Sequence, residues 1–374
     1  IGNDAFTLNM FNNGPTFVDY VLGANQQLVS GATVLTWVNR GGHWENTEQW
    51  SVGVDFGFWN NKLTGSLDGF IRNTNDMLMS VVAPAHVGNR YSATANVGKV
   101  RNRGIELSLE HRNTVTRDFS YSVSGNVSFI DNELTALNGG APIYTNYEGV
   151  QVVDQGYPLY YFYGYQNLGI YRTDQEALDH LHGYTSESTP FHAGDTKYAD
   201  NDGNGIIDGN DRVNLGSSIP WLNYGINLGA YYRDFDLQLF FQGVAGNKIY
   251  NQMRHRLEGD GSNSILAPVM ADAWTAENPD GSIANPRNSI NYKVSDRFLE
   301  DGSYFRLKNI QLGYTLPRRL IGKAGFENCR FYVQASNVFT ATKYKGFDPE
   351  VSGGVDYGNY PQSRTFLFGV NIVY

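Results

Sequence analysis

The residues best placed to do chemistry lie in an acidic, glycine-containing stretch at 200–211, which reads DNDGNGIIDGND. A twelve-residue calcium loop supplies oxygen ligands from positions 1, 3, 5, 7, 9 and 12, with a glycine at position 6 for the sharp bend. Gly205 occupies position 6. The six ligand positions hold Asp200, Asp202, Asn204, Ile206 (through its backbone carbonyl), Asp208 and Asp211. The spacing therefore predicts a structural calcium site, which magnesium could also occupy.

Two features of this stretch differ from the loop of EF-hand proteins. Position 12 is Asp211 instead of the usual bidentate Glu. In addition, the sequence shows no well-defined flanking helix, and both differences predict weaker binding. The alternative is an Asp/Asn/Gly-rich turn whose side chains only accept hydrogen bonds from their own backbone. We favour the cation, because four carboxylates within twelve residues repel one another unless a positive charge holds them together.

Other residues with chemical potential lack a pattern that would fix their geometry. Paired carboxylates could serve a glycosidase, and scattered candidates are Asp195, Asp272, Glu277, Asp296, Glu300 and Asp301. No shared motif brings any two of them together, so we interpret them as solvated loop charges. His180 and His182 would point to different sides of a helix, which disfavours a zinc site. The sequence also lacks a nucleophile elbow, a phosphate loop and a dinucleotide fingerprint. We therefore expect that the chain is not an enzyme.

The composition of the 374 residues narrows the class of protein. Charged residues make up 17%, below the roughly 25% of soluble domains. The mean hydropathy is −0.39 although 14% of the residues are aromatic, so polar residues dilute the apolar ones, as in two-sided strands. A net charge of −9 without long basic runs argues against nucleic-acid binding. The single cysteine, Cys329, excludes an intramolecular disulfide.

Nine segments alternate between apolar and polar residues with the period of two that is typical of strands. Eight of them pair across short connections; the clearest pair meets at the turn Arg233-Asp234. The segments are 50–58, 62–72, 103–111, 119–130, 221–232, 235–243, 304–316, 329–339 and 364–374. Their polar positions predict a water-facing wall made of Ser51, Asp55, Asp68, Asn223, Asn227, Asp236, Gln238 and Gln242.

The connections between pairs are long, at 73–102, 131–220, 244–303 and 340–363. Short turns at one end of ten-residue strands and long loops at the other are typical of outer-membrane barrels. No apolar run approaches the roughly 20 residues of a transmembrane helix. The sequence therefore predicts an all-β fold, an antiparallel transmembrane β-barrel. Its wall and long extracellular loops, including 131–220 with the calcium-type stretch and 244–303, would occupy 47–374, after an extracellular loop at 1–46 that leads into the first strand.

Within the long loops, two short helices and one aromatic cluster are expected. Residues 174–182 and 268–277 each predict one or two helical turns, with Thr173 or Asp174 as the N-cap of the first. The cluster PLYYFYGYQNLGIY at 158–171 could be a sugar-stacking surface. We favour loop packing or an interfacial girdle, because tyrosines gather naturally at such boundaries.

An open sheet edge is not tolerated in lipid, so the first and last strands need partners. The N-terminus has neither the basic start nor the apolar run of a signal peptide. We therefore expect that the first residue is internal to a longer precursor, whose earlier strands complete the barrel.

Four stretches resemble, in the same order, parts of the SusC/RagA-like branch of TonB-dependent outer-membrane transporters. They are WENTEQWSVGVDFGFWNNKLTGSLDGFIRNTNDMLM (44–78), NVGKVRNRGIELSLEHRN (96–113), YFRLKNIQLGYTLPRRL (304–320) and FYVQASNVFTATKYKGFDPE (331–350). The first resembles a mid-barrel hairpin of that family and the second the start of its next strand. The last two are similar to its C-terminal signature, down to Asn337 and the run Asp348-Pro349-Glu350. The resemblance covers most of 44–374.

The resemblance implies a fold and a function for the whole protein. In that family, a barrel of 22 strands surrounds an N-terminal plug, and a TonB box connects the plug to the TonB–ExbB–ExbD complex. A SusD-like surface lipoprotein caps the barrel. The chain would then be the C-terminal part of such a barrel, without the plug and early strands. The protein would import a nutrient, an oligosaccharide or a peptide, across the outer membrane of a Gram-negative, Bacteroidetes-like bacterium.

Two other classes of protein fit the strand pattern. The first is a passive porin or adhesin barrel that is complete in itself, which a signal peptide directly before Ile1 would favour. The second is a soluble, secreted calcium-binding carbohydrate module, which solubility without detergent would favour. A plug and TonB box upstream would indicate the active importer.

Overall fold

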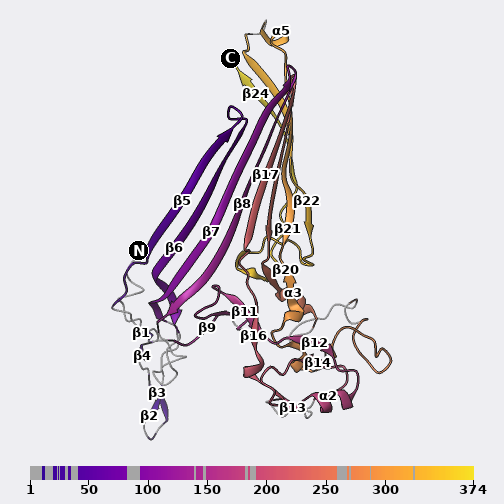
Figure 1. Cartoon of the computed structure of the whole chain (residues 1–374). Helices are drawn as coiled ribbons and strands as arrows, with labels where there is room; N and C mark the ends of the chain where they lie inside the picture. Colours follow the sequence, from indigo (N-terminus) through magenta and orange to yellow (C-terminus); the bar gives the residue numbers. More distant parts are fainter. Residues whose placement is uncertain are drawn as a thin grey trace.

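The computed structural model describes the long strands and most of the loops (Figure 1). The described residues are 41–81, 93–138, 140–145, 149–181, 184–185, 191–258, 268, 271–286, 288–322 and 325–374, with 11–12, 20–22, 24, 26–29 and 33–34 near the start. Most of the predicted leading loop at 1–46 therefore lies outside the described residues, and so does His182.

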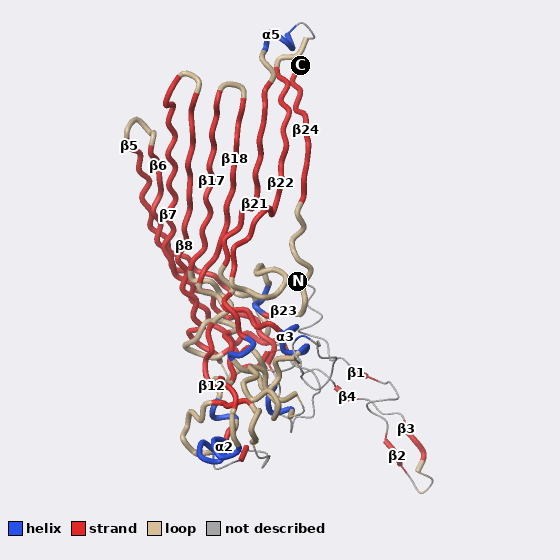
Figure 2. The backbone as a smooth tube through the Cα atoms, turned by 90° about the vertical axis from the view of Figure 1, so that its right-hand side faces the viewer, coloured by secondary structure: helices blue, strands red, loops and turns tan. Residues whose placement is uncertain are grey.

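Nine long antiparallel strands form one sheet, in which strands that follow each other in the chain lie side by side (Figures 1 and 2). All nine predicted segments are confirmed as strands of this sheet. The described sheet does not close on itself, and β5 and β24 are its edges. The strands are β5 (Asn46–Phe58), β6 (Leu63–Val81), β7 (Ala93–Thr116), β8 (Phe119–Leu137), β17 (Leu222–Tyr232), β18 (Phe235–Ala245), β21 (Tyr304–Thr315), β22 (Asn328–Thr342) and β24 (Thr365–Val373).

Tight turns join the strands at one end of the sheet. Between β5 and β6 the chain turns through Trp59, Asn60 and Asn61, which all have positive φ angles. Asparagine tolerates this left-handed conformation better than most residues, so the pair Asn60-Asn61 suits the reversal. Arg233, with φ of 53°, reverses the chain between β17 and β18.

At the other end, β6 and β7 run further than the alternation predicted, to Val81 and from Ala93. The register between them shifts between Thr74 and Met77 and again at Leu78. Such irregularities insert extra residues and break the period of two. The parts of β6 and β7 that the sequence did not predict are therefore the parts in which the alternation of apolar and polar residues fails.

The long loops pack into a layer of small elements at this second end of the sheet (Figure 2). The expectation that they carry little structure beyond two helices is wrong for the described residues. The short strands and helices of the loops are β9 (Ile143–Thr145), β10 (Gln151–Val153), β11 (Tyr161–Gly164), β12 (Asn167–Ile170), α2 (Asp174–Leu181), β13 (Tyr184–Thr185), β14 (Thr196–Tyr198), β15 (Ile206–Ile207), η2 (Gly209–Asp211), β16 (Val213–Gly216), β19 (Lys248–Asn251), α3 (Gln252–Leu257), η3 (Ser289–Tyr292), η4 (Asp296–Phe298), β20 (Leu299–Asp301), η6 (Ser352–Gly354) and β23 (Val355–Asp356). Outside this layer are β1 (Phe11–Asn12), β2 (Tyr20–Leu22), β3 (Gln27–Val29), β4 (Thr33–Val34) and α5 (Arg318–Ile321).

Segments far apart in the chain build the cores of this loop layer. The first core joins the two largest loops and comprises Tyr165, Tyr171, Ala177, Phe191, Tyr198, Ile207 and Ile290. A second core also recruits the last loop and comprises Val150, Phe162, Tyr250, Tyr292, Phe298 and Val355. A third, beside β6–β8, comprises Met79, Val100, Leu134, Leu137 and Val153. Burying these aromatic and aliphatic side chains stabilises the loops as a packed layer.

Of the two predicted loop helices, the first is confirmed, and the second, at 268–277, is helical among the described residues only at Pro268. The helix α2 begins as expected after Thr173, whose hydroxyl accepts a hydrogen bond from the Glu176 N–H at 3.1 Å. The second prediction is wrong for residues 271–277, where Ala273 makes a bridge with Ile283 and Asn278 closes a turn on Thr275. The alanines there suggested a helix, but contacts with 281–283 set the backbone.

Among the described residues, no helix combines the length and apolarity needed to cross a membrane.

Candidate functional site

The sheet has two chemically different faces, fixed by the register of its strands. On one face Val54 lies opposite Leu67, and Leu67 lies opposite Leu107. On this apolar face large side chains are exposed, with Val52 at 80% and Phe366 at 78%. An extended exposed apolar surface of this kind is the mark of contact with another protein or with lipid.

The opposite, polar face carries the wall that the sequence predicted. Asp55, Ser66, Ser108, Asn126 and Gly225 follow one another across five strands. The other predicted wall positions occupy the same face by alternation. Its hydroxyl, amide and carboxylate groups suit water or a hydrated solute.

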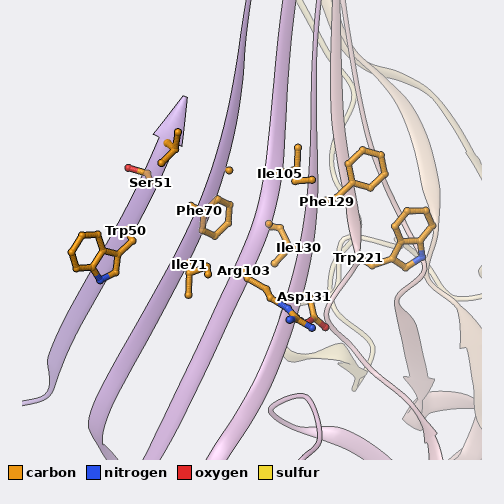
Figure 3. Close-up of a pocket in the computed structure, with 13 residues that line it drawn as sticks. Trp50, Ser51, Phe70, Ile71, Arg103, Ile105, Phe129, Ile130, Asp131 and Trp221 are labelled. Carbon is orange, nitrogen blue, oxygen red and sulfur yellow. The ribbon is translucent and has the colours of Figure 1, made fainter. Parts of the chain in front are cut away.

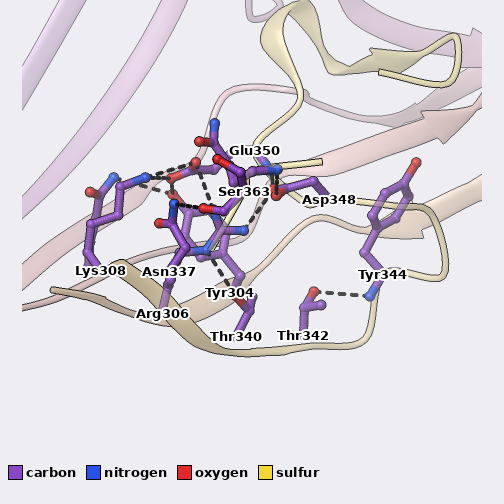
Figure 4. Close-up of polar contacts among 12 residues, drawn as sticks. Tyr304, Arg306, Lys308, Asn337, Thr340, Thr342, Tyr344, Asp348, Glu350 and Ser363 are labelled. Atoms are coloured by element: carbon purple, nitrogen blue, oxygen red, sulfur yellow. Dashed lines mark hydrogen bonds and ion pairs between the residues drawn. The ribbon is translucent and has the colours of Figure 1, made fainter. Parts of the chain in front are cut away.

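The densest polar cluster of this face lies where β21 and β22 meet the last loop, and it centres on Arg306 (Figure 4). Its side chain is only 2% exposed. It donates from Nη2 to Asp348 Oδ1 at 2.7 Å, from Nη1 to Glu350 Oε2 at 2.9 Å and from Nε to Thr340 Oγ1 at 2.9 Å. Lys308 Nζ adds a second cation 3.1 Å from Glu350 Oε2. We call Arg306, Lys308, Asp348 and Glu350 the anchor cluster.

Further contacts attach the last loop to the wall around this cluster. The hydroxyl of Tyr304 donates to Glu350 Oε1 at 3.0 Å, and the amide of Gln362 donates to Asp348 Oδ2 at 3.1 Å. Asn337, with φ of 55°, donates from Nδ2 to the carbonyl of Ser363 at 2.9 Å. Both ends of the loop between β22 and β24 are therefore tied to the polar face.

The anchor cluster also sets the charge state of its acids. Partial burial acts to raise the pKa of Asp348. The hydrogen bonds from the Glu350 amide and from Arg306 outweigh this effect, and the pKa of Asp348 lies below its usual range. The carboxylate is therefore ionised whenever the anchor is intact at neutral pH.

Sequence reasoning did not identify this cluster as a functional unit. The run Asp348-Pro349-Glu350 stands out in the sequence only through its resemblance to the family's C-terminal signature. A usable signal was present, because Arg306 and Lys308 are basic residues two apart on the polar side of a predicted strand. Their pairing with a loop some forty residues later is a tertiary contact that alternation cannot reveal.

The loop layer contains a second buried ionic group. Glu258, whose side chain is 7% exposed, accepts from Arg297 at 2.7 Å and from Arg254 at 2.5 Å. Removing either partner of such a buried pair leaves an uncompensated charge, which costs several kcal/mol. The loops around α3 and η4 are therefore held together by charge as well as by apolar packing.

The carboxylates considered for glycoside hydrolysis serve the loops in which they lie. Asp195 is buried and accepts from the side chains of Asn291 and Asn288 at 2.9 and 3.0 Å. Asp296 accepts from the Asn167 amide at 2.8 Å, and burial raises the pKa of Asp296. Asp272, Glu300 and Asp301 likewise hydrogen-bond to nearby loop groups, and Glu277 is exposed.

The predicted calcium loop folds around its first carboxylate. Asp200 accepts hydrogen bonds from the amides of Gly203, Asn204 and Gly205 at 2.7 to 3.2 Å. Although desolvation acts to raise the pKa of Asp200, these bonds lower it. The buried Asp211 accepts from the amides of Asn201 and Asp208 at 2.8 and 2.7 Å.

The structure brings three of the six predicted ligands together. Oxygens of Asp200, Asp202 and Asp211 all lie within 4.8 Å of one another. Desolvation and the charges of Asp211 and Asp200 raise the pKa of Asp202. The side chain of Asp208 instead caps η2 by accepting from the Asn210 amide at 2.7 Å. Asn204 accepts from the Ile206 amide at 2.7 Å.

The aromatic cluster at 158–171 belongs to the packing of the loops. Tyr161 and Phe162 are 3% and 1% exposed, and Tyr165 is also buried. Tyr161 stacks on Tyr157 with ring centroids 4.7 Å apart. Tyr160 is exposed and has a positive φ of 55°. The predicted preference for packing over a sugar-stacking surface holds for the buried members.

Comparison with protein families gives one clear match. The model of the TonB-dependent receptor-like β-barrel matches residues 9–338. TonB-dependent receptor P3 of Formosa agariphila is 32% identical over 94% of this chain. TonB-dependent receptor SusC of Bacteroides thetaiotaomicron is 29% identical over 100% of it. In both cases this chain spans 36% of the relative's length.

Comparison with solved structures gives matches that cover almost the whole of this chain. The structure of the RagAB peptide transporter matches 98% of this chain with a TM-score of 0.78 and 26% identity, over 38% of its own chain. The RagAB peptide importer in the "open-open" state matches 100% with a TM-score of 0.78 and 27% identity, again over 38% of that chain. The arrangement of wall and loop layer therefore recurs as part of a longer chain.

Proposed function

Because this chain belongs to the TonB-dependent receptor family, with a SusC-like β-barrel domain, we propose that it forms wall and loops of an active importer in the outer membrane. The observation that carries the proposal is the sheet with one exposed apolar face and one polar face. Lipid would cover the apolar face, and a hydrated passage would run along the polar one. The anchor cluster would keep the last loop seated against the passage wall.

We propose an oligosaccharide as the imported nutrient. The polar face offers many uncharged hydroxyl and amide groups, such as Ser108, Asn126 and Gln242. Such groups can exchange hydrogen bonds with the hydroxyls of a sugar. A peptide is the second candidate, supported by the likeness to the RagAB peptide transporter at 26% identity.

The proposed partners follow from the same relatives. A SusD-like surface lipoprotein would cover the loop layer, and the TonB–ExbB–ExbD complex would supply energy through a plug encoded outside this chain. Affinity purification of the full-length protein from native membranes tests the first partner. Recovery of a SusD-like lipoprotein in equal amount supports it, and recovery of the barrel alone contradicts it.

Energy dependence separates active import from a passive porin. Uptake of a fluorescent oligosaccharide is measured in cells that carry the full-length protein, with and without a functional TonB. We expect uptake to vanish when TonB is lost or when a protonophore is added. Unchanged uptake would favour the passive porin. Competition by unlabelled oligosaccharides or by peptides then distinguishes the two nutrient classes.

We also propose that residues 200–211 bind calcium as a structural ion. The proposal is supported by the convergence of Asp200, Asp202 and Asp211, and by the pKa of Asp202, which desolvation and repulsion from the charges of Asp211 and Asp200 raise. A cation there would remove this repulsion and hold the segment between β14 and β16 compact. Its role would be to stabilise the loop layer, away from any transport chemistry.

A further inference from the structure

A groove lies on the apolar face of the sheet, close to the loop layer (Figure 3). It has a volume of about 630 Å³, and side chains from four neighbouring strands and Trp221 line it. Its apolar walls are Trp50, Val52, Ile71, Ile105, Phe129 and Trp221. Arg103 and Asp131 lie together at one end, as Figure 3 shows. We call it the rim groove.

The groove exists because one position of the wall lacks a side chain. Gly69 lies in register between Val52 and Ile105 on the apolar face. A Cβ atom added there would meet nothing nearer than the Val52 carbonyl oxygen at 4.0 Å. Gly65 lies four residues before Gly69 in β6, on the same face of the sheet. The space over Gly65 is filled, because a Cβ added there would lie 2.6 Å from the Phe56 ring. The space over Gly69 is thus left open.

One wall of the groove, Trp221, is held in place by its own contacts. Trp221 stacks on Phe129 with ring centroids 5.8 Å apart and an angle of 18° between the ring planes. It also lies over Gly246, where an added Cβ would overlap the indole. A wall that is already fixed loses little conformational entropy when the groove binds a ligand.

The groove lies at the height where an apolar band would meet lipid headgroups. Phe58, beside the tight turn, and Trp50, at the groove, are eight residues apart on β5. At about 3.4 Å per residue and a tilt near 40°, this span covers about 20 Å of membrane thickness. The apolar band of such barrels is about 25 Å tall with aromatic residues at its borders. Arg103 and Asp131 then lie at headgroup level.

The charges at the groove end can take a phosphate. The Nε of Arg103 donates to Asp131 Oδ2 at 2.8 Å, and both side chains are more than half exposed. A guanidinium has five N–H donors, so one bond to Asp131 leaves donors for another acceptor. Lys99 and Arg101 alternate with Arg103 along β7. Arg101 pairs with Glu133, so Lys99 is the residue of the two that adds positive charge beside Arg103.

We propose that the rim groove binds a phosphate-bearing lipid of the leaflet next to the loop layer. One acyl chain lies over Gly69 between Trp50, Val52 and Ile105, and the headgroup phosphate accepts hydrogen bonds from Arg103. This inference depends on the proposed membrane location and goes beyond transport. It assigns the barrel a specific lipid at the border between its wall and its loops.

The test uses the full-length protein in phosphatidylcholine nanodiscs that contain a few per cent of lipid A, whose sugar headgroup carries phosphate. Native mass spectrometry counts the lipid A molecules that stay bound. Gly69→Leu fills the groove and Arg103→Gln removes the phosphate donor. Val123→Leu, on the same face, and Arg117→Gln, at a tight turn, are the matched controls.

We expect one retained lipid A per wild-type or control protein. Retention should fall at least about tenfold in each groove variant, as expected for loss of a charge-assisted hydrogen bond or of the space for the chain. Lipid A without its phosphates should be retained by the wild-type protein as poorly as intact lipid A is retained by Arg103→Gln. Equal retention by all variants, or retention of phosphatidylcholine alone, overturns the proposal while leaving the barrel assignment intact. Failure of every variant to enter nanodiscs overturns both.

Discussion

At the scale of single residues, Arg306 is a buried cation with two acidic partners. It lies on the polar face with 2% of its side chain exposed and bonds to two acids of the last loop, Asp348 and Glu350. Burying the charges of Arg306, Asp348 and Glu350 costs desolvation free energy, and the attraction between them offsets this cost only while all three are present. Single substitutions there should therefore act on the loop more than on the sheet.

Arg306→Gln should destabilise the attachment of the last loop by about 3–5 kcal/mol, since it removes the guanidinium that pairs with Asp348 and leaves Lys308 alone to pair with Glu350. Hydrogen exchange in nanodiscs should show faster exchange between β22 and β24 and unchanged protection in β7 and β8. Arg117→Gln, at an exposed turn, is the control and should change stability by less than about 0.5 kcal/mol. Equal protection of the loop in Arg306→Gln and wild type would contradict an anchoring role.

The lowered pKa of Asp348 makes the anchor sensitive to acid. A carboxylate with a pKa below its unfolded value of about 3.9 contributes stability above that pH and loses it as the pH falls towards the folded pKa. The difference in unfolding free energy between wild type and Asp348→Asn should therefore be constant from pH 7 to about 5. It should shrink below about pH 4, as followed by denaturant titration. A difference that grows on acidification would show that the sign is wrong.

The proposed calcium loop gives a second test on single residues. Asp202→Asn removes one exposed carboxylate of the cluster, which accepts hydrogen bonds from the amide and the side chain of Asn204. Calcium affinity, measured by calorimetry on the purified full-length protein, should lie at about 10⁻⁵ to 10⁻³ M, as for weak sites, and fall at least tenfold in the variant. Asp234→Asn, in a tight turn, should leave the affinity unchanged. If chelation alters neither stability nor exchange at 200–211, the turn interpretation is correct.

At the scale of elements, two glycines in neighbouring strands differ in whether close packing of the strands requires the absence of a side chain. At Gly104 of β7, an added Cβ would lie 2.3 Å from the Phe129 carbonyl oxygen and 2.9 Å from the Phe70 ring. At Gly69 of β6 the corresponding space is empty. The two glycines lie on adjacent strands, yet only one of them is required for close packing.

Gly104→Val should therefore cost about 1–3 kcal/mol, because it forces the β7–β8 pair or the Phe70 ring to move. Gly69→Val should be neutral or slightly stabilising, since valine favours strands and finds open space. Urea unfolding of the protein in vesicles measures both. A similar loss in the two variants would mean that backbone freedom, and not close approach, explains these glycines.

The contacts within the loop layer could not be predicted from the alternation of apolar and polar residues. The buried pair of Glu258 with Arg297 joins the segment after β18 to the segment before β21. The core of Tyr165, Tyr198 and Ile290 joins two loops that are separated in the chain by the β17–β18 hairpin. Apart from Tyr165, which lies in the aromatic cluster at 158–171, these residues have no sequence pattern around them that indicates the contact. Their burial is a property of loops packed on one another.

At the scale of the whole molecule, the proposal of a membrane barrel requires that the two faces of the sheet meet different solvents. Leu107, midway between the turn and the groove, lies on the apolar face opposite Leu67. Its neighbour Ser108 lies on the polar face opposite Ser66. The two positions are adjacent in the chain and differ only in the side to which they point.

Leu107→Arg should cost about 2–4 kcal/mol, as expected for arginine near the bilayer midplane. Ser108→Arg should cost far less, because its side chain would reach water. Folding into lipid vesicles, followed by the heat-sensitive shift on gels, measures both variants. If the two arginines were equally tolerated, lipid would not cover the apolar face and the soluble alternative would regain support.

The sequence by itself determined the nine strands, their pairing and the chemistry of the two faces. A strand that separates apolar from polar surroundings must alternate with a period of two, and that pattern is local. The same holds for the spacing of the acidic loop at 200–211 and for the cap of α2 at Thr173. Predictions failed where bulges break the period, as in the outer part of β6, and at 271–277, where a bridge displaces the helix.

Only the tertiary structure decided how the long loops fold, which acids Arg306 meets and where the wall is hollow. These features depend on contacts between residues tens to hundreds of positions apart, and loop sequences carry no periodic signal that records such contacts. The anchor cluster needs β21 and the last loop to meet at one point. The rim groove needs the register of four strands to leave Gly69 uncovered, which no single segment encodes.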